Sequence, residues 1–132
     1  MRMGTMGLAT GAVAETVDQI ADAALEEGLP VPDHISMMPT SVEDDRVALA
    51  RKLISDLKPG LTHFVLYPTR DTPEARTITP SWAYRVGDYE TFTTKELKDH
   101  LKGEGIQLID YKDLTSAMRC KNADSISNGN TR

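Results

Sequence analysis

The feature that most constrains the fold is a run of β-forming side chains from Leu61 to Tyr67, closed by Pro68. Apolar side chains fall on both alternating faces of this run, which is typical of a strand covered on both sides in a parallel sheet. A second, shorter strand is predicted over residues 106–109. The crossover of residues 68–105 is too long for a hairpin and favours parallel strands joined by a helical connection. The sequence therefore predicts an α/β fold.

Apolar periodicity and end signals predict three helices. Residues 12–27 place apolar side chains on one face, and Gly28 supplies a left-handed stop. Capping boxes at Thr40–Glu43 and Thr93–Glu96 predict where the next two helices begin. A short helical turn is predicted at Pro73–Ile78, with the proline in the first position. The expected buried positions of the three helices are Val13, Val17, Ile20, Ala21, Ala24, Leu25, Val47, Ala50, Leu53, Ile54, Leu57, Leu97 and Leu101.

The length of 132 residues suits one domain. We expect a single α/β domain over residues 1–114 and a disordered polar tail over 115–132, which shows no periodicity. Two strands are too few for a complete parallel sheet, because both faces need cover and both edges need neighbours. Pairing of two copies of the chain would hide such an edge, so a homo-oligomer is one expectation.

The chain has 15 basic and 20 acidic residues, a net charge of −5. This balance argues against nonspecific nucleic-acid binding and against docking on anionic membranes. The single cysteine, Cys120, excludes an internal disulfide and fits a reducing compartment. No run approaches the ~18 apolar residues of a membrane span, and glycine and threonine dilute the N-terminal stretch that a signal peptide would need. The predicted location is cytoplasmic.

Reactive residues of α/β folds gather where strands end. Here those positions are Tyr67, Thr69, Arg70 and Asp71 after the first predicted strand, and Asp110–Asp113 after the second. An Arg-Asp step can orient a polar substrate through the guanidinium fork, or it can be a solvated surface pair. For Arg70 and Asp71 the solvated pair is favoured, because no motif surrounds them.

No metal site can be assembled from spacing. The three histidines, His34, His63 and His100, form no pair that would place two ligands on one helix face. By alternation His63 is expected to be a hydrogen-bonded core residue, and His100 a surface residue. The acidic run Glu43–Asp45 is expected to stabilise a first helical turn. Glycine-rich phosphate loops and the serine hydrolase elbow are absent.

The most distinctive block is residues 57–114. It resembles the carboxyl-terminal end of the YdjC-like (ChbG/HpnK) carbohydrate deacetylases, whose pattern is Leu-x-Pro-Gly-x-Thr, apolar residues, His-Pro, Trp-x-x-Arg-x-x-Asp and Gly-Ile-x-Leu-Ile. The matching residues are Leu57, Pro59, Gly60, Thr62, Pro68, Trp82, Arg85, Asp88, Gly105, Ile106, Leu108 and Ile109. Tyr67 stands where the family has the histidine before proline.

The resemblance implies a partial (β/α) barrel-like fold with parallel strands and flanking helices. It implies hydrolysis of N-acetyl groups on sugars, with a divalent metal (Mg or Zn) that polarises the amide carbonyl and activates water. The family's Asp-Asp-x-Gly and His-rich metal segments carry over to no residue of this chain, so we expect it to be inactive alone. We place Tyr67, Arg70 and Arg85 as binding residues for an acetylated amino sugar or oligosaccharide. For Arg85 the favoured role is structural, in a pair with Asp88 or a strand-end carboxylate, and substrate contact is the alternative.

Two alternatives stay open. One is a noncatalytic α/β module that binds a small polar ligand or oligomerises through its unclosed sheet edge. The other is a truncated product without stable structure, which three well-capped helices speak against.

Overall fold

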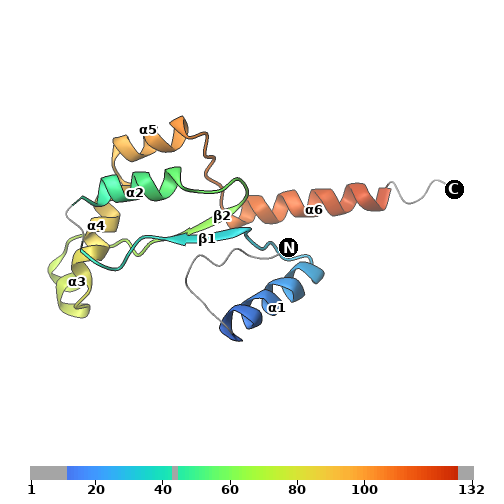
Figure 1. The fold of residues 1–132 in the computed structure, drawn as a ribbon, viewed down its shortest axis with the longest axis horizontal. Helices are drawn as coiled ribbons and strands as arrows, with labels where there is room; N and C mark the ends of the chain where they lie inside the picture. Colours follow the sequence, from blue (N-terminus) through green and yellow to red (C-terminus); the bar gives the residue numbers. More distant parts are fainter. Residues whose placement is uncertain (1–11, 43–44, 128–132) are drawn as a thin grey trace. The chain divides into compact units, whose positions relative to one another are not determined.

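The computed structural model describes residues 12–42 and 45–127 (Figure 1). Within these residues the chain forms six helices and a two-stranded parallel sheet, so the predicted mixed α/β class is confirmed. The sheet is not closed into a barrel. Residues 34–107 form one compact unit, and the segments up to residue 33 and from residue 108 form another. The N-terminal stretch weighed as a signal peptide falls largely outside the described residues.

The sheet joins β1 (His34–Met37) and β2 (Thr62–Val65) in parallel, with His34 opposite Thr62 and Met37 opposite Val65. The ladder extends one residue further at each end: the His34 N–H donates to the Leu61 carbonyl and the Met38 N–H to the Val65 carbonyl, each at 3.0 Å. Helix α2 (Arg46–Ser55) lies between the strands in the chain, and the three elements make a β-α-β unit.

The parallel pairing was predicted, but its partner strand was not. The predicted strand at Leu61–Tyr67 is confirmed as β2, whereas the predicted strand at 106–109 is wrong. The Ile106 N–H donates instead to the Leu101 carbonyl at 3.0 Å, after Gly105 adopts a φ of 72°. This bond closes the end of α5 in a Schellman motif. Ile106 therefore terminates a helix, and it packs against the core as a helix end does.

The remaining helices are α1 (Ala12–Glu26), α3 (Pro73–Ile78), α4 (Trp82–Phe92), α5 (Lys95–Gly103) and α6 (Tyr111–Ser127). The prediction for α1 is confirmed, including its stop: Gly28 has a φ of 74°, and the Leu29 N–H donates to the Ala24 carbonyl at 2.8 Å. The turn at α3 is confirmed as well, with Pro73 in its first turn and the Thr72 side chain as its cap. No helix in the described part of the chain is long and apolar enough to cross a membrane.

Both predicted capping boxes were misplaced. Helix α2 begins at Arg46, where the Asp45 carboxylate caps it by accepting from the Ala48 N–H at 2.9 Å. The predicted start at Thr40 is thus wrong by a turn and a half, and Glu43 and Asp44 of the acidic run lie outside the described residues. Helix α5 is capped by Thr94 and not by Thr93. In both cases a short polar side chain further along the chain, Asp45 or Thr94, supplies the same capping chemistry.

Two helices were not predicted. Helix α4 occupies residues 82–92, which carry aromatics and a glycine and show no clear apolar stripe. Helix α6 runs through residues 115–127, where the sequence predicts a disordered tail. The Asp110 carboxylate starts α6 by accepting from the Asp113 N–H at 2.8 Å. The domain limit at residue 114 itself stays a prediction.

The core of the 34–107 unit lies where α2, α5 and the sheet meet. Met38, Ala50, Ile54 and Leu97 are each at most 2% exposed. Figure 1 shows α2 and α5 on the same side of the sheet, and the ring centroids of Phe64 and Phe92 lie 5.7 Å apart. Seven partly buried apolar residues complete this layer: Leu49, Leu53, Phe64, Leu66, Phe92, Leu101 and Ile106. One face of the sheet is therefore covered by helices of its own unit.

We expect Leu97→Ala to lower the free energy of unfolding by about 2–5 kcal/mol, because it leaves a cavity at the centre of this core. Urea denaturation followed by circular dichroism measures the change. Ile78→Ala is the matched control, because Ile78 is 81% exposed, and it should change stability by less than about 0.5 kcal/mol. Equal effects of the two substitutions would contradict this placement of the core.

Candidate functional site

The residues after β2 run along helix α4. Tyr67 follows β2 by two residues and is 38% exposed. Arg85, on α4, places its guanidinium carbon 5.3 Å from the centre of the Tyr67 ring. The Thr69 N–H donates to the Arg85 carbonyl at 3.1 Å. The exit from β2 therefore lies along α4, although Tyr67 and Arg85 are far apart in the sequence.

Two further contacts lie beside this pair on α4, because Tyr84 precedes Arg85 and Tyr89 follows it by one helical turn. The Arg70 Nε donates to the Tyr89 hydroxyl at 3.2 Å, and its guanidinium carbon lies 5.8 Å from that ring. Arg85 lies 5.5 Å from the Tyr84 ring and donates through Nε to the Ser81 hydroxyl at 3.2 Å. We call Tyr67, Arg70, Tyr84, Arg85 and Tyr89 the tyrosine–arginine site.

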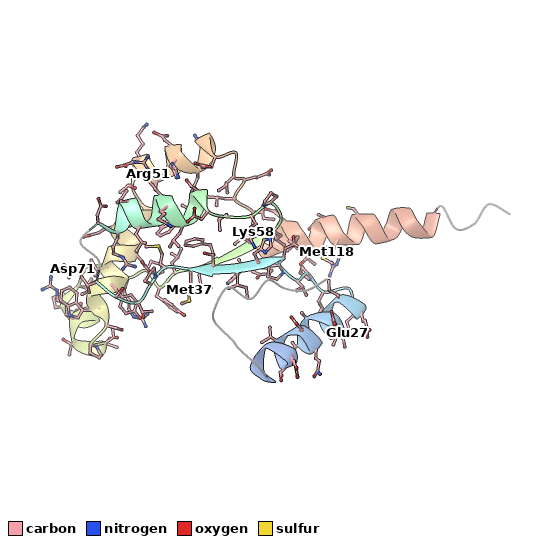
Figure 2. All side chains as sticks on the ribbon, viewed as in Figure 1. Glu27, Met37, Arg51, Lys58, Asp71 and Met118 are labelled. Atoms are coloured by element: carbon pink, nitrogen blue, oxygen red, sulfur yellow. The ribbon has the colours of Figure 1, made fainter. Side chains whose placement is uncertain are left out.

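Neither guanidinium of this site forms an ion pair with a carboxylate of the described residues. Two predicted pairings are therefore wrong. Asp71 does not pair with Arg70; both of its oxygens accept from Arg76 at 2.6 Å. Asp88 does not pair with Arg85; its partner is Arg46. Figure 2 shows Asp71 at the end of the unit where α3 lies.

The Arg46–Asp88 ion pair is the best-buried polar contact near the site. The Arg46 side chain is 7% exposed and that of Asp88 is 1% exposed. Asp88 uses its second oxygen to accept from the Tyr67 N–H at 3.0 Å. Arg46 also donates to the Ser41 carbonyl at 2.6 Å and to the Pro39 carbonyl at 3.1 Å. One ion pair thus holds the segments that follow both strands.

Sequence reasoning missed Arg46. A buried arginine in the first turn of a helix looks like any surface arginine when only the sequence is known. The matched position Asp88 was noted, but its partner lies 42 residues away. Asp110–Asp113, expected at a second strand end, instead begin α6, which belongs to the other unit.

The predictions for the histidines concerned the burial of His63 and His100. His34 lies with Nε2 3.3 Å from the Pro59 carbonyl oxygen. His63 is exposed, so its prediction as a core residue is wrong. The His100 side chain is partly buried, at 16% exposed, between α2 and α5. No group of three or more His, Cys, Asp or Glu within the described residues is placed to hold a metal ion.

Ser55, His100 and Glu104 lie close together, as a serine nucleophile, its base and a carboxylate would. The His100 Nε2 lies 3.2 Å from the Arg51 carbonyl oxygen, which can only accept, so Nε2 carries the hydrogen. Nε2 is therefore a donor to the Ser55 hydroxyl at 3.1 Å. That hydroxyl donates its own hydrogen to Glu104 at 2.9 Å. The imidazole cannot take the serine proton in this arrangement, so the cluster ties α2 to α5 and is no catalytic triad.

The tyrosine–arginine site has the chemistry of a binding surface. Its aromatic rings offer flat apolar area with polar edges, and its guanidinium groups offer several N–H donors in a fixed plane. The described groups can therefore hold and orient an oxygen-rich ligand.

Comparison of the chain with models of known protein families, with curated proteins and with solved structures finds no match. The resemblance of residues 57–114 to the carbohydrate deacetylases accordingly stays a prediction. What bears on function is the geometry of the site itself.

We expect the pKa of the Asp71 carboxyl to lie below its usual 3.8, chiefly because the Arg76 side chain donates hydrogen bonds to the charged form. The stabilisation from this pair is present above that usual value and is lost as the pH falls through the lowered pKa. A carboxyl-detected NMR titration measures the midpoint. In Arg76→Gln the midpoint should return towards 3.8, whereas Arg51→Gln, at a distant surface pair, should leave it unchanged. A midpoint unaffected by Arg76→Gln would contradict the assignment.

Proposed function

We propose that this chain is a carbohydrate deacetylase-like protein that binds an acetylated amino sugar at the tyrosine–arginine site. The observation that carries the proposal is the exposed Tyr67 ring at the carboxyl end of a parallel strand, with the Arg85 guanidinium 5.3 Å away. Ligands of α/β folds bind at this end of the strands. The proposed location of the protein is cytoplasmic.

The chemistry of an acetylated amino sugar suits these residues. Its ring carbons present C–H groups that can lie against a tyrosine ring, and its hydroxyls and acetyl carbonyl accept hydrogen bonds. Arg70 and Arg85 each use Nε within the site, which leaves the outer guanidinium nitrogens to donate to such acceptors. The β1-α2-β2 unit also supports the finer proposal of a partial (β/α) barrel, because such a barrel is built from this repeated element.

The proposal assigns binding, and not hydrolysis, to the described residues. The resemblance implies a divalent metal, and the described residues offer no group of ligands that fits one. No reaction step is therefore assigned to Tyr67, Arg70 or Arg85 beyond holding and orienting the sugar.

A second candidate is a noncatalytic module that assembles with a copy of itself. The observation in its favour is the sheet, in which β1 and β2 each have a single neighbour among the described strands. Their outer edges present backbone groups that another strand could pair with. Sedimentation of the chain over a range of concentrations separates this candidate from a monomeric sugar-binding protein.

Titration calorimetry with N-acetylglucosamine tests the proposed function. We expect saturable binding that weakens by about tenfold in Tyr67→Ala and in Arg85→Gln, since each removes a contact worth ~1–2 kcal/mol. Tyr111→Ala and Arg51→Gln are matched controls from outside the site and should bind as the unsubstituted chain does.

Glucosamine, which lacks the acetyl group, should bind more weakly than N-acetylglucosamine if the acetyl oxygen is recognised. The proposal fails if N-acetylglucosamine does not bind, or if the control variants weaken binding as much as the site variants do.

A further inference from the structure

We infer that the buried Arg46–Asp88 ion pair is the positioning device of the tyrosine–arginine site: it fixes the backbone at Tyr67, and through it the ring that the ligand meets. The inference rests on the proposed function for its ligand, but its structural half can be measured without any ligand. Neither Arg46 nor Asp88 is proposed to touch the sugar.

The hydrogen bonds of Asp88 support this role. One carboxylate oxygen accepts from Arg46 and the other accepts from the Tyr67 N–H at 3.0 Å. Tyr67 lies beyond the last residue of β2, where ladder hydrogen bonds no longer hold the chain. The carboxylate therefore takes over at the point where the sheet ends, with a charge-assisted bond, which is stronger than a neutral one.

Arg46 fixes the direction of that carboxylate. Its two terminal nitrogens reach the Ser41 and Pro39 carbonyls as well as Asp88, so the guanidinium has little freedom to turn. Its Nε is buried without a hydrogen-bond partner among the described atoms. The tip of the Arg46 side chain is therefore held by three acceptors. Its buried Nε makes no such bond, which costs free energy, so the fold keeps this side chain in place despite that cost.

Gly87 provides an independent sign that the position of Arg46 matters. A Cβ at this helical residue would lie 2.5 Å from the Arg46 Cδ and 3.0 Å from its Nε. Alanine would otherwise favour the helix over glycine. The glycine beside Asp88 thus leaves room for the arginine stem to pass α4.

A contribution to stability alone explains the contacts of Arg46 and Asp88 less well than a positioning role does. Buried ion pairs often contribute little net stability, because desolvation of two charges offsets their attraction. What this pair supplies is a fixed geometry for the segments after both strands. The distinction can be tested, because a positioning role affects Tyr67 more than the rest of the unit.

Gly87→Ala and Gly103→Ala make a matched pair of variants. Both replace a helical glycine by alanine, and Gly103 has open space where the new Cβ would go. Gly87→Ala displaces Arg46 while it keeps every hydrogen-bonding group. Asp88→Asn removes the charge at nearly constant size, and Ile54→Val lowers core stability without touching the ion pair.

Amide hydrogen exchange by NMR gives the first readout, as the protection of the Tyr67 amide relative to an interior α2 amide such as Leu53. We expect this ratio to fall about 10- to 100-fold in Gly87→Ala and in Asp88→Asn, as for loss of a hydrogen bond to a charged group. It should not fall in Gly103→Ala or in Ile54→Val, because a loss of global stability lowers the protection of the Leu53 amide at least as much as that of the Tyr67 amide. An unchanged ratio in Gly87→Ala and Asp88→Asn would overturn the inference.

The second readout is the affinity for N-acetylglucosamine. This affinity should weaken in Gly87→Ala and Asp88→Asn and stay unchanged in Gly103→Ala and Ile54→Val. Lack of binding by the unsubstituted chain would end the proposed function, and the exchange ratio would still decide whether the pair positions Tyr67. Unchanged affinity together with a lowered exchange ratio would overturn the link between the ion pair and ligand binding.

Discussion

The 34–107 unit depends on one buried ion pair more than on any other polar contact. A two-stranded parallel sheet provides few backbone hydrogen bonds, and the segments that follow its strands have no ladder to hold them. Arg46 and Asp88 bond to these segments instead. The carbonyls of Pro39 and Ser41, after β1, accept from the Arg46 guanidinium. The N–H of Tyr67, after β2, donates to the Asp88 carboxylate. The apolar layer of α2 and α5 gives the unit its stability, and the ion pair gives the strand ends their shape.

Local patterns in the sequence predicted the elements whose physics is local. The helix at α1, its stop at Gly28, the turn at α3 and the strand at β2 all follow from periodicity or from glycine and proline. The strand β1 could not be predicted in this way, because His34–Met37 is short and half polar and becomes a strand by pairing with Thr62–Val65. Ile106 was predicted to lie in a strand because it is a β-forming residue. Its N–H instead donates to a carbonyl at the end of α5. Helix α4 lacks a clear stripe because its buried residues include Asp88 and Thr91.

The candidate site divides in the same way. Tyr67 and Arg70 were predicted from their place after a strand, and their role in binding stays a prediction; the structure adds that Arg85 lies beside Tyr67. The ion-pair partners could not be predicted, since every arginine near a carboxylate in sequence is a candidate and packing selects among them. Arg85, expected to pair with a carboxylate, lies instead against the rings of Tyr67 and Tyr84.

The connection between the two strands also bears on how the unit folds. A tight turn cannot join β1 to β2, because the two strands run in the same direction. The segment from Met38 to Leu61, which includes α2, has to connect them. The ladder therefore closes a loop whose entropy is compensated only when α2 has already packed on the strands. We therefore expect the β1-α2-β2 unit to unfold as one cooperative event.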